Sequence, residues 1–489
     1  MRRTAGVALA FGAVAAFTLH GGRGKVFDDP FILYRYARNL ASGQGWTFNA
    51  GLRDGAGVTS PLYVVVLAVL YKCGLPMQTA AAGVFALGLT VCATSTYVIF
   101  DRVGKPVVGL VAGILVVTNP WITAVRGMET GLFLGVLGVA LLLYIAERPL
   151  AAGLAFALLC VVRPDGALYA AGAIGWELFH HRRLAALIPL VGPLVAVLTL
   201  WAGYAEIAMG QVVPDTLHAK EAQTRSGYFG HGHLFIRGFL DAPRNYDFRA
   251  WVLILYLAAL LGAAALIWSH RDQPSRFLVP LLAGDLLLVG AYGLVFNVPY
   301  QYLWYYVPII YGLCVLAAIA ADELARVIDR HLAHAGSGVV LIGAAGAAII
   351  GTRYPLVLVA RSSYEPAADW VAANSTPRQT LAADEIGLVG WYSHRRIVDY
   401  VGLLSTRTAD EFQARHATWW IREFQPDFWM VYQGGPQPNG VKGAGYPWDV
   451  AVLRQPWFPG AYRVAYQNSV VIIYKKSGSI PPASADRPT

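Results

Sequence analysis

Two adjacent carboxylates, Asp28 and Asp29, directly follow the first hydrophobic segment of the chain and open a polar stretch broken by glycines. Arg35 and Arg38 lie in the same stretch. A carboxylate can take a proton as a general base, and a guanidinium can bind a phosphate through paired hydrogen bonds. Residues 21–61 are therefore predicted to form an active-site loop.

A short helix is predicted to position these groups. Asp29 precedes a proline, and because proline is favoured in the first helical turn, Asp29 can cap a helix that ends near Gly43. On such a helix Arg35, Arg38 and Asn39 lie three and four residues apart and share one face. The alternative is that Asp29 serves only as a helix cap and that the arginines bind lipid headgroups.

The composition indicates that the surrounding elements are membrane helices. Hydrophobic residues make up 56% of the 489 residues, charged residues make up 14%, and the mean hydropathy is +0.48. One soluble core cannot bury this much apolar surface, so we expect a polytopic α-helical membrane protein with about 11–13 transmembrane helices.

The charge and the cysteines exclude other classes. The net charge is +9, but the basic residues form short clusters beside hydrophobic runs rather than one basic face, so nucleic-acid binding is not indicated. The four cysteines lie in apolar segments without paired spacing, which indicates neither a disulfide framework nor a zinc site.

Apolar windows throughout residues 1–354 predict a membrane module. The positive-inside rule places its basic clusters in the cytoplasm, namely 181–183, 270–276 and 321–335. The first loop, the loop 211–248 and the C-terminal region then share the outer face. With a cytoplasmic N-terminus, an outer C-terminal region requires an odd number of membrane crossings, whereas the apolar windows suggest twelve. Either one of the two apolar segments between residues 61 and 100 does not cross the membrane, or a span has been missed.

Residues 355–475 are predicted to form a small extracytoplasmic α/β domain. Runs with a period of two residues occur at 395–402, 427–434 and 468–476, with Asp, Gly and Pro between them. The tail 476–489 is expected to be disordered.

The first loop also resembles a known family. DDPFILYRYARNLASGQGWTFNAG (28–51), followed by Thr-Ser-Pro-Leu, resembles the first outer loop of bacterial GT-C membrane glycosyltransferases, particularly the group with the terminal arabinofuranosyltransferases of actinobacterial cell walls. Further pieces match in order: RGMETGLF (126–133), RPDG (163–166), VVPDTLHAK (212–220) and ADEIGLVGWYSHRRIVDYVGLL (383–404). The resemblance implies a GT-C-like fold.

The resemblance further implies an inverting glycosyltransferase of the bacterial inner membrane. Such an enzyme takes a sugar, here first expected to be arabinofuranose, from a polyprenyl-phosphate donor and attaches it to a hydroxyl of a glycan, lipid or protein acceptor on the outer face. In the family an acidic residue of the first outer loop acts as base, which maps onto Asp28 or Asp29. Asp28 is favoured because Asp29 is better placed to cap the helix.

The leaving phosphate needs positive charge, and the candidates are Arg35, Arg38, Arg163 and Lys220. For Arg163, which follows an apolar span, the alternative is an ion pair with Asp165 or Glu129 that holds helix ends together. For Lys220, the alternative is a solvated loop lysine.

The substrate-binding candidates lie in the motifs that match the family or in an aromatic cluster at 298–308. They are Glu129, Asp165, His218, Trp304 and Tyr305. The aromatic residues could stack on a sugar or line a groove for the lipid carrier, or they could form an interfacial belt. A structural role for Glu129 is the alternative to orienting a sugar hydroxyl.

No cofactor is expected to be required, and no metal ligands are assigned, although a divalent cation at Asp28 or Asp29 stays open. Two other functional classes remain. A transporter or flippase of a lipid-linked sugar would share the spans and the basic groups, and a non-catalytic membrane protein would use the loop to bind a partner.

Overall fold

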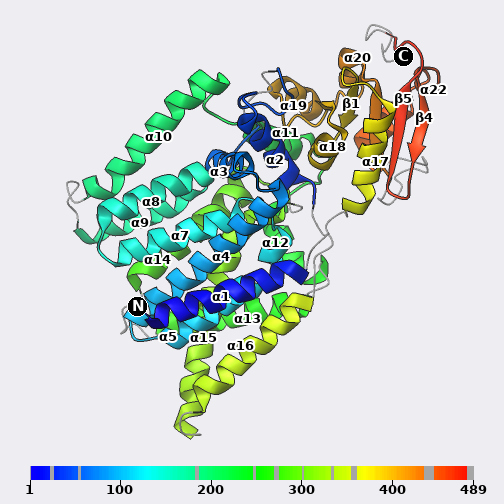
Figure 1. Ribbon diagram of the computed structural model, residues 1–489. Helices are drawn as coiled ribbons and strands as arrows, with labels where there is room; N and C mark the ends of the chain where they lie inside the picture. Colours follow the sequence, from blue (N-terminus) through cyan, green and yellow to red (C-terminus); the bar gives the residue numbers. More distant parts are fainter. Residues whose placement is uncertain are drawn as a thin grey trace.

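The computed structural model describes residues 2–21, 27–52, 57–181, 187–245, 249–268, 275–299, 302–331, 335–353, 361–433 and 445–481. A bundle of apolar helices carries a smaller α/β domain at one end (Figure 1). The predicted fold class is therefore confirmed. The proposed domain border at 354–355 and residues 482–489 of the expected disordered tail lie outside the described residues.

The helices of the bundle are mostly apolar. They are α1 (Arg2–Gly21), α3 (Pro61–Lys72), α4 (Met77–Arg102), α5 (Pro106–Thr118), α6 (Pro120–Ala124), α7 (Thr130–Ile145), α8 (Pro149–Val162), α9 (Gly166–His181), α10 (Ile188–Met209), α13 (Arg249–Trp268), α14 (Ser275–Gly290), the π-helical turn η2 (Ala291–Val295), α15 (Val307–His331) and α16 (Gly336–Arg353). Proline stands in the first turn of several of them, where its missing N–H costs nothing.

Six helices in the described part of the chain are long and apolar enough to cross a membrane, and five further apolar helices are shorter. Between residues 61 and 100, α4 has 26 residues but α3 has only 12. A helix of that length rises about 18 Å, well short of a hydrocarbon core of about 30 Å. The crossing of these two segments stays a prediction, because α5 with 13 residues and α8 with 14 are nearly as short as α3.

Small residues let the central helices approach closely. Gly88 of α4 lies against Gly131 and Gly135 of α7, and a Cβ added to Gly88 would overlap the Gly131 carbonyl group. Close backbone approach of this kind maximises van der Waals contact where lipid supplies no hydrophobic drive. The α4–α7 crossing thereby fixes the position of α7 and of Glu129, which directly precedes it.

The C-terminal domain contains a five-stranded mixed sheet in the order β2-β1-β3-β5-β4. The first three strands in this order are parallel, and β5 is antiparallel to both β3 and β4. The strands are β1 (Thr380–Ala383), β2 (Arg396–Asp399), β3 (Phe428–Tyr432), β4 (Tyr462–Gln467) and β5 (Val471–Lys476). The domain's helices are α17 (Arg361–Asn374), α18 (Ile386–Ser393), α19 (Thr406–Gln413), α20 (Trp419–Phe424), α21 (Pro447–Leu453) and α22 (Phe458–Ala461).

The three predicted period-two runs contain β2, β3 and β5, so these predictions are confirmed. The strands β1 and β4 were not predicted. β1 is four residues of sequence TLAA, which is too short and too uniformly buried to show an alternating pattern.

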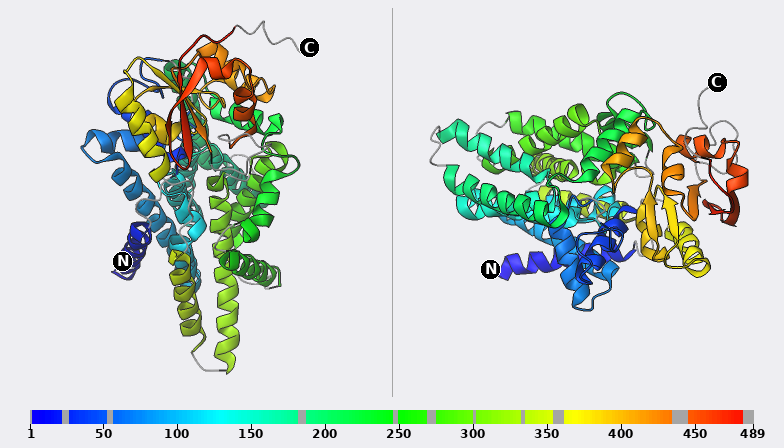
Figure 2. Two further views of the ribbon diagram at one scale, coloured as in Figure 1. Left: turned by 90° about the vertical axis from the view of Figure 1, so that its right-hand side faces the viewer. Right: turned by 90° about the horizontal axis from the view of Figure 1, so that it is seen from above.

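Further helices lie in the connections between the apolar helices. They are α2 (Asp29–Ala41), α11 (Asp215–Ser226), α12 (Leu234–Asn245) and the 3-10 turn η3 (Leu303–Tyr305). In Figure 1, α2 and α11 lie between the bundle and the C-terminal domain, and α10 lies on the opposite flank; the view from above in Figure 2 agrees. The predicted helix from Asp29 to about Gly43 is confirmed as α2.

Candidate active site

A cavity of about 450 Å³ lies where the connecting helices α2 and α11 meet the bundle. Residues of the first loop, of the segments around residues 128 and 163, of α11 and of η3 line it. It brings together these sequence-predicted residues: Asp29, Glu129, Arg163, Asp165, Lys220, Trp304 and Tyr305. Asp28, Arg35, Arg38 and His218 are not part of its lining.

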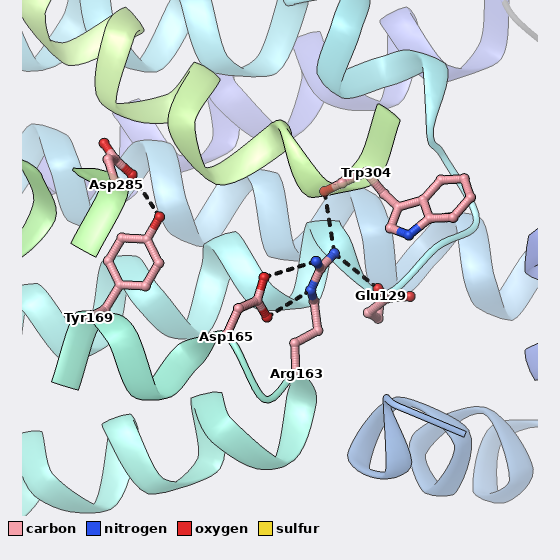
Figure 3. Close-up of polar contacts among 6 residues, drawn as sticks. All are labelled: Glu129, Arg163, Asp165, Tyr169, Asp285 and Trp304. Atoms are coloured by element: carbon pink, nitrogen blue, oxygen red, sulfur yellow. Dashed lines mark hydrogen bonds and ion pairs between the residues drawn. The ribbon is translucent and has the colours of Figure 1, made fainter. Parts of the chain in front are cut away.

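Arg163 is buried and fully engaged. Its Nε and Nη2 donate to the two carboxylate oxygens of Asp165 at 3.0 and 2.8 Å, and its Nη1 donates to Glu129 Oε1 at 3.2 Å and to the Trp304 carbonyl at 3.3 Å (Figure 3). Its guanidinium also lies 5.1 Å from the centre of the Tyr305 ring. The ion pairs posed as the alternative for Arg163 are therefore present, and they join the ends of α7, α8 and α9.

Figure 3 also shows a second buried polar pair beside this triad. The Tyr169 hydroxyl of α9 donates to Asp285 Oδ1 of α14 at 2.6 Å. A buried polar group needs such a partner, because an unmade hydrogen bond in the membrane interior is costly. The pair fixes α9 relative to α14. Because Asp165 directly precedes α9, the pair also helps to hold Asp165 in the cavity wall.

Glu129 keeps one oxygen without a partner. Its Oε1 accepts from Arg163, but its Oε2 is buried and has no hydrogen-bond partner among the described residues. Burial raises the pKa of the carboxyl, and the Arg163 charge opposes this. A hydroxyl placed in the cavity could satisfy this oxygen.

Lys220 is the second cation of the described lining. It projects from α11, is 6% exposed, and its Nζ lies 3.3 Å from the centre of the Tyr302 ring. Burial lowers its pKa to about 8, while Asp29 and Glu385 act to raise it. It forms no ion pair with the described residues, so its charge is available to an anion in the cavity.

Asp29 is the first residue of α2 and lines the cavity. Burial raises the pKa of its carboxyl, and Lys220 opposes this shift. Its carboxylate does not cap α2, because the N-cap position belongs to Asp28 and no side-chain cap bond is formed there. The expectation that Asp29 caps the helix is therefore wrong.

Asp28 faces the C-terminal domain instead. Its Oδ2 accepts from the Gly387 N–H at 2.8 Å and its Oδ1 from the Leu388 N–H at 2.6 Å. These are the second and third residues of α18, so Asp28 caps a helix that lies far away in the sequence. Burial and the charge of Asp29 raise the pKa of Asp28 to about 7.

Arg35 also holds the C-terminal domain rather than facing the cavity. Its guanidinium donates to the carbonyls of Phe48, Gly390 and Arg395 at 2.7, 2.8 and 2.7 Å and to the Asn49 side chain at 3.2 Å. With its donors engaged in this way, Arg35 is not placed to bind a donor phosphate, which corrects the expectation from the sequence.

Arg38 lies one turn further along α2. It stacks over the Trp391 ring at 4.6 Å and makes a 3.3 Å contact between Nη1 and His394 Nδ1. Arg35 and Arg38 share one face of α2, as predicted, and this face is turned to α18. A phosphate contact is therefore not supported for Arg38 either.

His218 points away from the cavity. Its Nε2 lies 2.7 Å from Asp410 Oδ1 of α19, which connects α11 to the C-terminal domain. The expected substrate contact of His218 is therefore not supported. Among the described residues, no group of three or more His, Cys, Asp or Glu side chains is arranged to hold a metal ion.

The sequence did not single out the apolar wall of the cavity. Leu198, Trp201 and Met209 of α10 contribute to it, together with Val212 and Val213. These residues of α10 are three and eight positions apart and share a helix face. Because α10 is apolar all round, nothing in its pattern distinguishes that face from the others.

In sequence, the chain resembles one family model and one characterised enzyme. Residues 353–479 match a model described as Domain of unknown function (DUF8728). Over 287 residues the chain is 32% identical to a terminal beta-(1->2)-arabinofuranosyltransferase of Mycobacterium tuberculosis, with 53% of this chain and 43% of that enzyme covered. The chain thus spans less than half the length of this relative.

Solved structures share the architecture. ArnT from Cupriavidus metallidurans bound to undecaprenyl phosphate superimposes with a TM-score of 0.61 at 12% identity, covering 99% of each chain. The oligosaccharyltransferase of Archaeoglobus fulgidus gives 0.57 at 12% identity, covering 87% of this chain and 67% of that one. The mycobacterial arabinofuranosyltransferase AftD gives 0.51 at 16% identity, covering 96% of this chain and 41% of that one.

At these identities the structural likeness establishes the fold. The bundle, its connecting helices and the C-terminal domain all fall within the region shared with ArnT. This chain has the fold of the GT-C membrane glycosyltransferases and is similar in sequence to a terminal arabinofuranosyltransferase.

Proposed function

We propose that this protein is an inverting glycosyltransferase that moves a sugar from a polyprenyl-phosphate donor to an acceptor hydroxyl. One observation carries the proposal: a carboxylate, Asp29, and a lysine without an ion pair among the described residues, Lys220, face one cavity that has an apolar wall. A phosphate attached to a long hydrocarbon chain requires such a combination.

The donor would lie with its hydrocarbon along α10 and its phosphate at Lys220. Leu198, Trp201 and Met209 supply apolar surface, and α10 is otherwise largely exposed on the flank of the bundle. With a pKa of about 8, Lys220 is mostly protonated at neutral pH. Arg163 is less suited to the phosphate because Asp165 and Glu129 already take its hydrogen bonds.

In the transfer step the acceptor oxygen attacks the anomeric carbon from the face opposite the phosphate. Asp29 takes the hydroxyl proton as the new carbon–oxygen bond forms. The bond between the anomeric carbon and the phosphate oxygen breaks, and polyprenyl phosphate leaves with its negative charge beside Lys220. The step as proposed needs no metal ion.

Arabinofuranose is the proposed sugar, and the support for it is the similarity to the terminal arabinofuranosyltransferase. Glu129 is proposed to accept a hydrogen bond from a sugar hydroxyl through Oε2, and the Trp304 and Tyr305 rings to contact the sugar. We assign Arg163 and Asp165 the role of holding Glu129 in place.

We place the cavity and the C-terminal domain on the outer face of a bacterial inner membrane. The support is the distribution of basic residues, which puts the opposite loops in the cytoplasm. The acceptor would then be a glycan, lipid or protein of the cell envelope.

The test is to incubate the protein in nanodiscs with decaprenyl-phosphate arabinofuranose, mannose or glucose and a synthetic octyl arabinofuranoside disaccharide. We expect consumption of the arabinofuranose donor and a product extended by one pentose, both followed by mass spectrometry. If correctly folded protein consumes none of the donors, the proposed function is wrong. Movement of intact donor across the membrane without transfer would instead identify a flippase.

A further inference from the structure

The motif ADEIG (383–387) in the C-terminal domain has no role in the transfer described so far. It ends at the start of α18, where the N–H groups of Gly387 and Leu388 bind the Asp28 carboxylate. The approach is close, because a Cβ added to Gly387 would overlap the Asp28 carbonyl oxygen. This contact brings the N-terminal end of α18 directly beside the residue that precedes Asp29.

The N-cap position of α18 is occupied by Glu385. An N-cap side chain normally accepts a hydrogen bond from the second or third residue of its helix. Here Asp28 accepts both bonds, and the Glu385 side chain makes no cap bond. The capping by Asp28 therefore leaves the Glu385 carboxylate available, and it has no hydrogen-bond partner among the described residues.

The surroundings of Glu385 are those of the candidate active site. It is partly buried, and the charges that act on it include those of Asp28, Asp29 and Lys220. Burial, followed by the neighbouring carboxylates, raises its pKa well above the ordinary value, and Lys220 opposes the shift.

The same domain also forms part of the cavity wall. Leu403 and Leu404 line the cavity, and Asp399 holds the loop that carries them by accepting from the N–H groups of Val401, Gly402 and Leu404 at 3.0, 3.1 and 2.8 Å. The C-terminal domain therefore builds one edge of the cavity, and Glu385 lies behind its lining residues near Asp29 and Lys220.

We propose that Glu385 binds the acceptor sugar, with its carboxylate accepting hydrogen bonds from acceptor hydroxyls next to the one that reacts. This inference rests on the proposed function. The C-terminal domain then completes the active site, in addition to packing against it. One carboxylate can accept from two neighbouring hydroxyls at once, a geometry that sugars offer.

The position of Glu385 favours the acceptor over the donor. In Figures 1 and 2, α10 lies on one side of α2 and α11, and the C-terminal domain lies on the other. Residues of α10 supply the apolar wall of the cavity. A donor whose hydrocarbon follows α10 approaches Lys220 from one side, so an acceptor that attacks from the opposite face of the sugar arrives from the side of Glu385.

The test compares Glu385→Gln with Glu423→Gln, which makes the same change in the same domain. Glu423 pairs with Arg407 at 3.1 Å on the surface and does not line the cavity. Binding of the octyl arabinofuranoside disaccharide and of decaprenyl phosphate is measured by titration in nanodiscs, and transfer is measured separately. Glu385→Asp, which keeps the charge, serves as a second variant, and thermal unfolding checks that each variant is folded.

Loss of a hydrogen-bond-accepting carboxyl oxygen is expected to weaken acceptor binding by about tenfold or more in Glu385→Gln. Decaprenyl phosphate binding should stay unchanged, Glu385→Asp should recover part of the acceptor affinity, and Glu423→Gln should match the wild type. Equal acceptor affinity in Glu385→Gln and wild type, or no acceptor binding by the wild type, would overturn the inference. A wild type that binds the acceptor but consumes no donor contradicts the proposed function and leaves this comparison interpretable.

Discussion

At the scale of single residues, Asp28 and Asp29 are neighbours in the chain with different surroundings. Asp28 has both carboxylate oxygens bound by backbone N–H groups of α18, whereas Asp29 lines the cavity and interacts with Lys220. A general base needs a free oxygen within reach of the acceptor hydroxyl. We therefore assign proton removal to Asp29 and domain docking to Asp28.

Lys220 sets a pH dependence at the same scale. Burial lowers its pKa to about 8, so its positive charge is present below this pH and is lost as the pH rises through it. We predict that kcat/KM for the donor falls above about pH 8, because this ratio reports groups of the free enzyme. Rates measured between pH 6 and 10, a range that extends about 2 units to either side of the shifted lysine pKa, test this.

Lys220→Arg is the informative variant, because arginine keeps its proton throughout this range. Its activity should be lower, since the guanidinium has a different shape, but the fall above about pH 8 should vanish. Lys476→Arg, at the C-terminal end of β5 where the lysine donates to Gln425, should retain the wild-type profile. An unchanged alkaline limb in Lys220→Arg would show that another group titrates.

At the scale of elements, the first loop holds α18 through contacts made by α2. Asp28→Asn replaces one acceptor oxygen by an amide N–H, which then faces a backbone N–H of Gly387 or Leu388. We predict local opening of the first turn of α18, with hydrogen exchange at Gly387 and Leu388 faster by about tenfold or more. Hydrogen exchange followed by mass spectrometry checks this, and equal protection in variant and wild type would contradict the capping role.

The triad of Arg163, Asp165 and Glu129 joins the ends of three helices. Arg163→Ala leaves two buried carboxylates without their cation, and we predict a loss of about 3–5 kcal/mol in unfolding free energy. Arg407→Ala removes an exposed pair with Glu423 and should cost less than about 1 kcal/mol. Unfolding of both variants in the same detergent gives the comparison, and similar small losses would mean that the triad does not hold the helices.

At the scale of the whole molecule, the cavity is assembled from segments far apart in the chain. The sequence alone allowed prediction of the membrane bundle, the helix α2, three strands and several cavity residues, because each rests on a local pattern. The separate roles of Asp28 and Asp29 could not be predicted, since they depend on α18, which lies about 360 residues further along. The engagement of Arg35 has the same origin, because its carbonyl partners at Gly390 and Arg395 have no sequence signature.

The C-terminal domain and the bundle both shape the cavity. It contacts α2 through α18, contacts α11 through the His218–Asp410 pair, and contributes Leu403 and Leu404 to the cavity. In the proposed transfer, a cavity lined by both parts keeps water from the reacting carbon, so that the sugar passes to the acceptor rather than to water.

We propose Asp29 as the base of a sugar transfer in this cavity. The most direct measurement is kcat of Asp29→Asn with decaprenyl-phosphate arabinofuranose in nanodiscs, beside Asp101→Asn at the exposed end of α4 as the matched control. We predict that Asp29→Asn lowers kcat by about 100- to 10,000-fold while donor binding and thermal unfolding stay at wild-type values. A kcat for Asp29→Asn within about twofold of the wild type would contradict this assignment.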